Sequence, residues 1–124
     1  IMALVGFGPD DTEKDMDYIL DKISNLRIFT DENDKMNLSV KDIGGGLLIV
    51  PNFTLYGDAR QGRRPGYSNA AQPEKAADMF DRLKEKASQI DVKKVEFGIF
   101  QADMKVELLN DGPVTILLDS HKNF

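Results

Sequence analysis

Two stretches with the apolar spacing of an α-helix constrain the fold of this chain more than any other feature. Apolar residues recur every three or four positions over about 12–27 and again over about 74–89. Thr12 and Asp15 resemble a capping box at the first start, and Pro73 stands where the first turn of a helix tolerates proline. We therefore predict two amphipathic helices. Their inward-facing residues are Met16, Ile19, Leu20, Ile23 and Leu26 in the first and Ala76, Met79, Phe80, Leu83, Ala87 and Ile90 in the second.

Short apolar runs that are typical of β-strands lie before, between and after these helices. They are "IMALVGF", "LLIVPNFTLYG", "KKVEFGIF", "MKVELLN" and "PVTILLD". Pro51 lies inside the second run and predicts an edge strand or a bulge, because proline donates no ladder hydrogen bond. Hairpin-like connections join the last runs. The sequence thus predicts one α+β domain over residues 1–124, with a mostly antiparallel sheet and two amphipathic helices packed on it.

The composition excludes several classes of protein. No apolar run approaches 18 residues, so no membrane-spanning helix is predicted. The absence of cysteine rules out disulfides and thiolate chemistry and fits a cytoplasmic protein. His121 is the only histidine, which argues against a Ser-His-Asp triad or a histidine-rich zinc site. The net charge of −5 argues against a general nucleic-acid coat but leaves room for a local basic patch.

The stretch "PNFTL" is a first candidate for chemistry. At a bulge, successive N–H groups of Asn52, Phe53 and Thr54 would point away from the sheet and form a site for an oxyanion. The alternative is an edge strand with a tolerated proline and a threonine of ordinary β propensity.

The stretch "RQGRRPGY" is a second candidate. Arg60, Arg63 and Arg64 share one loop punctuated by glycine and proline, and arginine forks match phosphate oxygens. The alternative is that these arginines pair with the many surface carboxylates of the chain.

The stretch "NDGPVT" is a third candidate. Asn110, Asp111 and Gly112 favour a tight turn, and Pro113 follows where a strand should resume. One interpretation is a plain turn. The other is a cis Gly112-Pro113 bond, which would hold two carbonyl groups nearly parallel as a rigid pair of acceptors.

Three longer stretches resemble one family in order along nearly the whole chain. They are "NLRIFTDENDKMNLSV", "NFTLYGDARQGRRP" and "FQADMKVELLNDGPVTILLD", and the family is the D-aminoacyl-tRNA deacylases. The resemblance implies a small α+β domain that forms a homodimer in the cytoplasm and needs no cofactor or metal. It implies hydrolysis of the ester that links a D-amino acid, or glycine, to the terminal ribose of tRNA.

The resemblance also assigns roles to residues. In the family, a cis Gly-Pro step enters the pocket of the partner subunit and tests chirality, and it corresponds here to Gly112 and Pro113. The other family motif begins Ser-Gln, where this chain has Pro51 and Asn52. The resemblance implies catalytic N–H groups at Phe53 and Thr54. It implies substrate binding by Asn52, Phe100 and Met104, of which Phe100 and Met104 would lie near the terminal adenosine. It also implies tRNA binding by Arg60, Arg63 and Arg64.

Departures from the family pattern leave alternatives open. A related group of deacylases has Pro-Gln at the altered position and acts on a different mischarged tRNA, so a shifted amino-acid specificity is one alternative. A hairpin-forming segment precedes "IMALVGF" in the family, and we expect this chain to be incomplete at that end. A second alternative is a non-catalytic tRNA-binding relative. A third, weaker one is a metal hydrolase that uses the tract "DEND".

Overall fold

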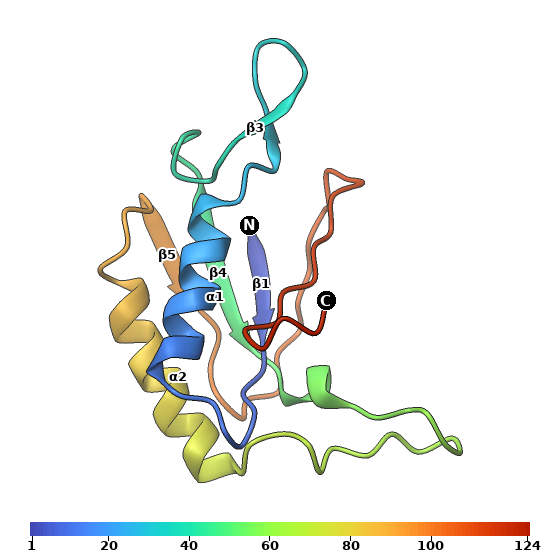
Figure 1. Cartoon of the computed structure of the whole chain (residues 1–124). Coiled ribbons are helices and arrows are strands. Elements are labelled where there is room, and N and C mark those ends of the chain that lie inside the picture. Colours follow the sequence, from blue (N-terminus) through green and yellow to red (C-terminus); the bar gives the residue numbers. More distant parts are fainter.

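A three-stranded sheet covered on one face by two helices forms the centre of the molecule (Figure 1). The computed structural model describes all 124 residues. A two-stranded hairpin and one 3-10 helix complete the regular structure. The elements are β1 (Met2–Val5), α1 (Glu13–Asn25), β2 (Phe29–Thr30), β3 (Met36–Leu38), β4 (Gly46–Pro51), η1 (Phe53–Tyr56), α2 (Pro73–Ala87) and β5 (Lys94–Phe97).

The main sheet is parallel, so the prediction of a mostly antiparallel sheet was wrong. Its strand order is β1-β4-β5, and β4 pairs in parallel with both neighbours. The chain passes through α1 between β1 and β4 and through α2 between β4 and β5. Each helix returns the chain to the end of the sheet where the previous strand began, which is how parallel neighbours are connected. The separate two-stranded sheet of β2 and β3 is antiparallel.

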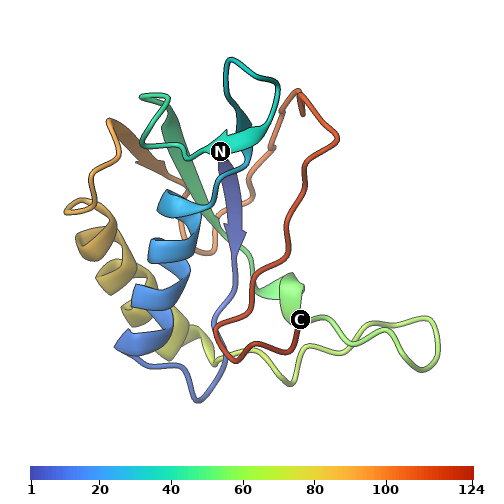
Figure 2. The same ribbon diagram turned by 45° about the horizontal axis from the view of Figure 1, so that its top comes forward.

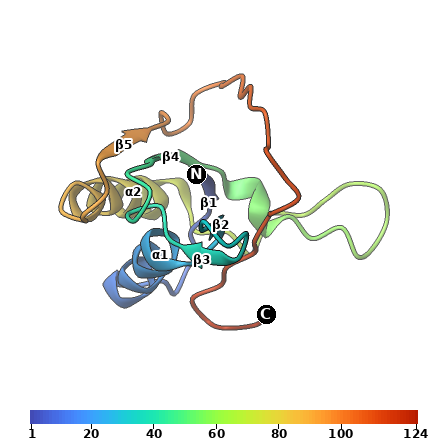
Figure 3. The same ribbon diagram turned by 90° about the horizontal axis from the view of Figure 1, so that it is seen from above.

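Both predicted helices are confirmed, and their apolar faces make the core with the sheet. Seen from above, α1 and α2 lie side by side on the same face of β1, β4 and β5 (Figure 3). Leu47 and Ile49 alternate with exposed Leu48 along β4, so they face the helices. Phe80 is almost completely buried and packs against Phe97 and Phe100. The apolar face of each helix therefore packs against the sheet, as its amphipathic pattern predicts.

Pro51 occupies a different position from the predicted edge or bulge. It is the last residue of β4, the central strand, and lies opposite Val5 of β1. The next residue resumes the hydrogen bonding, since the Asn52 N–H donates to the Val5 carbonyl at 2.8 Å. Proline is tolerated here because the sheet is ending.

Two of the three strands predicted for the C-terminal part are absent. The run "KKVEFGIF" contains β5, but residues 105–119 have no strand. Their backbone follows an extended course around the β1 side of the molecule without a neighbouring strand to pair with (Figure 3). Their apolar side chains remain largely exposed, at Val106, Leu108, Leu109, Ile116 and Leu117. Strand-like sequence alone does not form a ladder without a partner.

The segment 57–72, called the arm below, projects from the body between η1 and α2 (Figure 2). An isolated antiparallel bridge between Asp58 and Gly66 closes its base, with N–O distances of 2.7 and 2.9 Å. No helix of the structure has the length and apolar character that crossing a membrane requires.

Candidate functional site

The residues that were predicted to form an oxyanion site lie at the turn from β4 into η1. Asn52 is the N-cap of η1, and its Oδ1 accepts hydrogen bonds from the Thr54 N–H at 3.1 Å and from Thr54 Oγ1 at 2.5 Å. The Phe53 N–H, at the first position of η1, has no hydrogen-bond acceptor within the chain. Of the three predicted donors, only the Phe53 N–H is thus free, because the Asn52 N–H donates to the Val5 carbonyl and the Thr54 N–H to the side chain of Asn52.

Met104 adjoins the start of this turn. A Cβ added to Gly98 would lie 2.9 Å from Met104 Sδ and 3.2 Å from Pro51 Cδ, so both side chains border the same glycine. The Ile99 N–H donates to Met104 Sδ at 3.4 Å. The predicted substrate-binding residue Met104 and the "PNFTL" stretch therefore lie at one place.

Phe100 is half-buried and contributes to the core as well as to the predicted site. Its ring stacks on Phe80 with centroids 6.4 Å apart and an interplanar angle of 29°. Only the remaining surface of the ring is available to a ligand. The predicted contact with the terminal adenosine stays a prediction.

Gly112 and Pro113 lie far from the other predicted site residues of the same chain. Their peptide bond is cis, which was one of the two interpretations of "NDGPVT". Both residues are exposed, and the orange-to-red turn of the C-terminal part, to which they belong, lies well away from η1 (Figures 1 and 2). The chain alone does not bring this turn to Phe53.

Of the three arginines of the arm, one forms an ion pair and two do not. Arg60 forms a two-pronged ion pair with Asp58, at 2.8 Å from Nε to Oδ1 and 2.7 Å from Nη2 to Oδ2. This pairing lowers the pKa of Asp58 to about 2 and raises the pKa of Arg60. Arg63 and Arg64 are exposed and form no ion pair. The alternative of pairing with carboxylates is thus realised for Arg60 and not for the other two.

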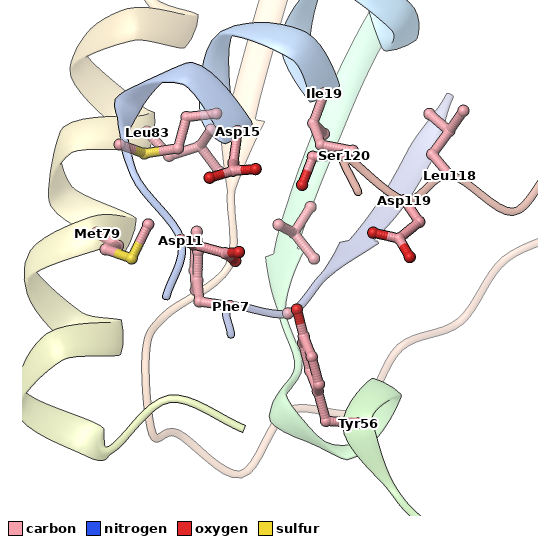
Figure 4. Close-up of a pocket in the computed structure, with 13 residues that line it drawn as sticks. Phe7, Asp11, Asp15, Ile19, Tyr56, Met79, Leu83, Leu118, Asp119 and Ser120 are labelled. Atoms are coloured by element: carbon pink, nitrogen blue, oxygen red, sulfur yellow. The ribbon is translucent and has the colours of Figure 1, made fainter. Parts of the chain in front are cut away.

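A cavity of about 60 Å³ lies on the Tyr56 side of η1. Figure 4 shows Asp11 and Asp15 from the α1 end, Asp119 from the C-terminal segment and Tyr56 from η1 around it. Burial, followed by the nearby charges of Asp11, Asp119 and Asp15, raises the pKa of Tyr56 to about 12. The space suits a few water molecules and is too small for an aminoacyl nucleotide.

His121 joins this cluster, which the sequence analysis missed. Its Nε2 lies 3.5 Å from Asp11 Oδ1 and 3.3 Å from Asp15 Oδ1. Burial raises the pKa of Asp11, whereas a hydrogen bond from the Thr12 N–H lowers that of Asp15. These three side chains have the atom types and proximity of metal ligands. Their contacts with one another and with backbone N–H groups account for the arrangement without an ion. The only signal in the sequence was the single histidine near the end.

The tract "DEND" forms the turn of the β2–β3 hairpin. Asp31 accepts hydrogen bonds from the N–H groups of Asn33 at 2.8 Å and Lys35 at 3.1 Å. These bonds lower the pKa of Asp31. They explain the tract as turn chemistry, which removes the motivation for a metal site there.

Comparison with known proteins agrees with the resemblance found in the sequence. A family model described as D-Tyr-tRNA(Tyr) deacylase matches residues 1–119. The D-aminoacyl-tRNA deacylase of Clostridioides difficile (strain 630) is 60% identical over 124 residues, which cover all of this chain and 83% of that protein. The D-aminoacyl-tRNA deacylase of Kosmotoga olearia is 59% identical, with 82% of its length covered.

Solved structures support the fold. That of the c-Myc DNA Unwinding Element Binding Protein superimposes with a TM-score of 0.85 at 34% identity, over 93% of this chain and 78% of that one. The structure of a probable eukaryotic D-amino acid tRNA deacylase has a TM-score of 0.73 at 18% identity, over 90% of this chain and 80% of that one. The second likeness is one of fold alone.

Proposed function

The chain belongs to the D-Tyr-tRNA(Tyr) deacylase family, and from this premise we propose that it hydrolyses the ester bond of D-aminoacyl-tRNA in the cytoplasm. The free N–H of Phe53, two residues after the central strand ends at Pro51, is the observation in the structure that carries the proposal. We also expect glycyl-tRNA to be a substrate, because a main-chain site that rejects an L side chain finds none to reject in glycine.

The chemistry needs few protein groups. An aminoacyl ester is already activated, and binding it in the right geometry with a donor aimed at the developing oxyanion supplies a large part of the acceleration. The Phe53 N–H is that donor. The Thr54 N–H becomes a second donor only when Asn52 Oδ1 releases it. With no cysteine in the chain and His121 paired with Asp11 and Asp15, we propose that the 2′-OH of the ribose moves the proton.

We propose further that two subunits complete the site. Gly112 and Pro113 stand at an exposed tip away from Phe53 of their own chain, and exposed apolar side chains such as Leu109 and Leu117 line the segments on either side of the tip. Such apolar surface marks an interface with another protein. In a symmetric homodimer the tip would enter the partner's pocket, and its main-chain carbonyls would bind the α-amino group of the substrate while leaving no room for an L side chain.

The test compares hydrolysis of D-Tyr-tRNA, L-Tyr-tRNA and glycyl-tRNA, with and without a chelator. We expect D-Tyr-tRNA and glycyl-tRNA to be cleaved and L-Tyr-tRNA to be spared, at rates that the chelator does not change. Binding of tRNA without turnover would instead establish a non-catalytic relative, and cleavage of glycyl-tRNA alone would establish a shifted specificity.

The variant Thr54→Ala separates two roles of this residue. A backbone donor survives the substitution, so we expect substantial activity to remain. Complete loss together with a trapped acyl-enzyme would show that the hydroxyl is a nucleophile, which the lack of a neighbouring base argues against.

A further inference from the structure

Phe53 and Tyr67 form an exposed aromatic pair at the base of the arm. Their ring centroids are 5.1 Å apart and the rings meet edge to face at 72°. Despite this contact Phe53 remains 57% exposed and Tyr67 39% exposed. Aromatic rings normally bury most of their surface, so a pair that leaves this much of its surface in solvent suggests a ligand-binding surface.

The pair is held in place by the backbone around it. A Cβ added to Gly57 would lie 3.1 Å from Tyr67 Cε1 and 3.0 Å from the Thr54 carbonyl oxygen, so the Tyr67 ring rests directly on a glycine. The bridge between Asp58 and Gly66 fixes the residue just before Tyr67. The Phe53 ring is carried by η1. The geometry of the pair is therefore set before any ligand binds.

Positive charge lies along the same arm. Arg63 and Arg64 precede Tyr67 by four and three residues, and neither forms an ion pair. In a chain with a net charge of −5, exposed aromatic rings and unpaired arginines thus occur together in one short segment. Aromatic faces that stack on bases, next to cations that follow the backbone, are the means by which proteins bind single-stranded nucleic acid.

We propose that the Phe53–Tyr67 pair is a stacking platform for an unpaired nucleobase at the 3′ end of tRNA, with Arg63 and Arg64 on the adjacent phosphates. This inference rests on the proposed function, and it names a contact that binds the substrate outside the reacting ester. Because Phe53 also carries the free N–H, its ring and its backbone would bind neighbouring parts of one substrate. The platform would hold the terminal nucleotides so that the ester reaches that donor.

The experiment measures binding of uncharged tRNA, in its full-length form and in a form that lacks the unpaired 3′ nucleotides. Stacking of one base contributes about 1–3 kcal/mol, so Tyr67→Leu should weaken binding of the full-length tRNA roughly 5- to 150-fold. The same variant should bind the truncated tRNA as the unsubstituted protein does. Tyr67→Phe keeps the ring and is the matched control, with affinity expected to stay within about twofold. For each variant, the ratio of its affinity for the full-length tRNA to its affinity for the truncated tRNA reports stacking.

Three results would overturn the proposal. They are an unchanged affinity of Tyr67→Leu for the full-length tRNA, an equal loss for both forms of tRNA, or a changed sedimentation coefficient that reveals the pair as a protein interface. Phe53→Leu, which keeps the backbone N–H, repeats the test should Tyr67→Leu fail to fold. Hydrolysis of D-Tyr-tRNA by the unsubstituted protein is measured separately. Absence of this hydrolysis would refute the proposed function. The difference in affinity between the two tRNA forms would still show whether the Phe53–Tyr67 pair binds a nucleobase.

Discussion

Asn52 Oδ1 receives both hydrogen-bond donors of Thr54, the backbone N–H at 3.1 Å and the hydroxyl at 2.5 Å. The contact caps η1 and fixes the turn that presents Phe53. Asn52→Ala should lower the free energy of unfolding by about 0.5–2 kcal/mol, the usual cost of removing an N-cap. Urea unfolding measures this change.

Asn52→Asp is the control for this prediction. A carboxylate keeps an acceptor at the same place and suits the positive end of a helix, so the stability should remain close to that of the unsubstituted protein. Equal destabilisation by the Ala and Asp variants would show that the two hydrogen bonds do not stabilise the turn.

Because only Arg60 of the arm is ion-paired, we expect the three arginines to contribute unequally to the salt dependence of tRNA binding. Arg63 and Arg64 are free, whereas Arg60 is held by Asp58. The double variant Arg63→Ala, Arg64→Ala should flatten the dependence of log K on log salt by roughly 0.7–0.9 for each phosphate that the variant no longer binds. Arg60→Ala should change the slope less. Binding of tRNA across a salt series gives both slopes, and an unchanged slope in the double variant would assign Arg63 and Arg64 to ordinary surface.

The sequence predicted the two helices, because these depend on local periodicity, but it placed Pro51 at an edge or bulge and not at the end of the central strand. It did not predict the parallel sheet. Parallel and antiparallel strands share the same apolar runs, and the difference lies in which strands become neighbours after α1 and α2 have packed. The runs "MKVELLN" and "PVTILLD" were wrong as strands for a related reason, since a ladder needs a second strand.

Parts of the candidate site were also beyond local reasoning. The capture of the Thr54 N–H by Asn52 depends on the N-cap geometry of η1. The approach of His121 to Asp11 and Asp15 joins residues more than a hundred positions apart. The aromatic pair needed the bridge that brings Tyr67 back to Phe53. The contact of Asn52 with Thr54 is local, across two residues, whereas the other two are tertiary contacts for which the sequence offers no spacing rule.

Gly98 provides a test of how Met104 is positioned. A side chain at this residue would meet Met104 Sδ at 2.9 Å and Pro51 Cδ at 3.2 Å, so Gly98→Ala should displace Met104. We expect a lower kcat/KM for D-Tyr-tRNA and a loss of stability of about 1–3 kcal/mol, as for other overpacked sites.

A double-mutant cycle gives the control for Gly98. Met104→Ala removes the nearer of the two side chains that the new methyl group would meet, so adding Gly98→Ala to it should cost less than Gly98→Ala costs alone. Strictly additive effects on stability and activity would mean that the two residues are not coupled.

Tyr56 makes the stability of the protein depend on pH in the alkaline range. Burial, and then the charges of Asp11, Asp119 and Asp15, raise the pKa of its phenol from 10.0 to about 12. Between these values the unfolded chain loses the proton while the folded chain keeps it. Unfolding then releases a proton, and the stability that Tyr56 contributes is complete below pH 10 and declines as the pH rises toward 12. Tyr56→Phe should therefore lose less stability than the unsubstituted protein between pH 9 and about pH 11. Urea midpoints at several pH values measure the two slopes, and the offset at pH 7 gives the cost of removing the hydroxyl itself. Parallel slopes would show that the phenol ionises as readily in the folded chain as in the unfolded one.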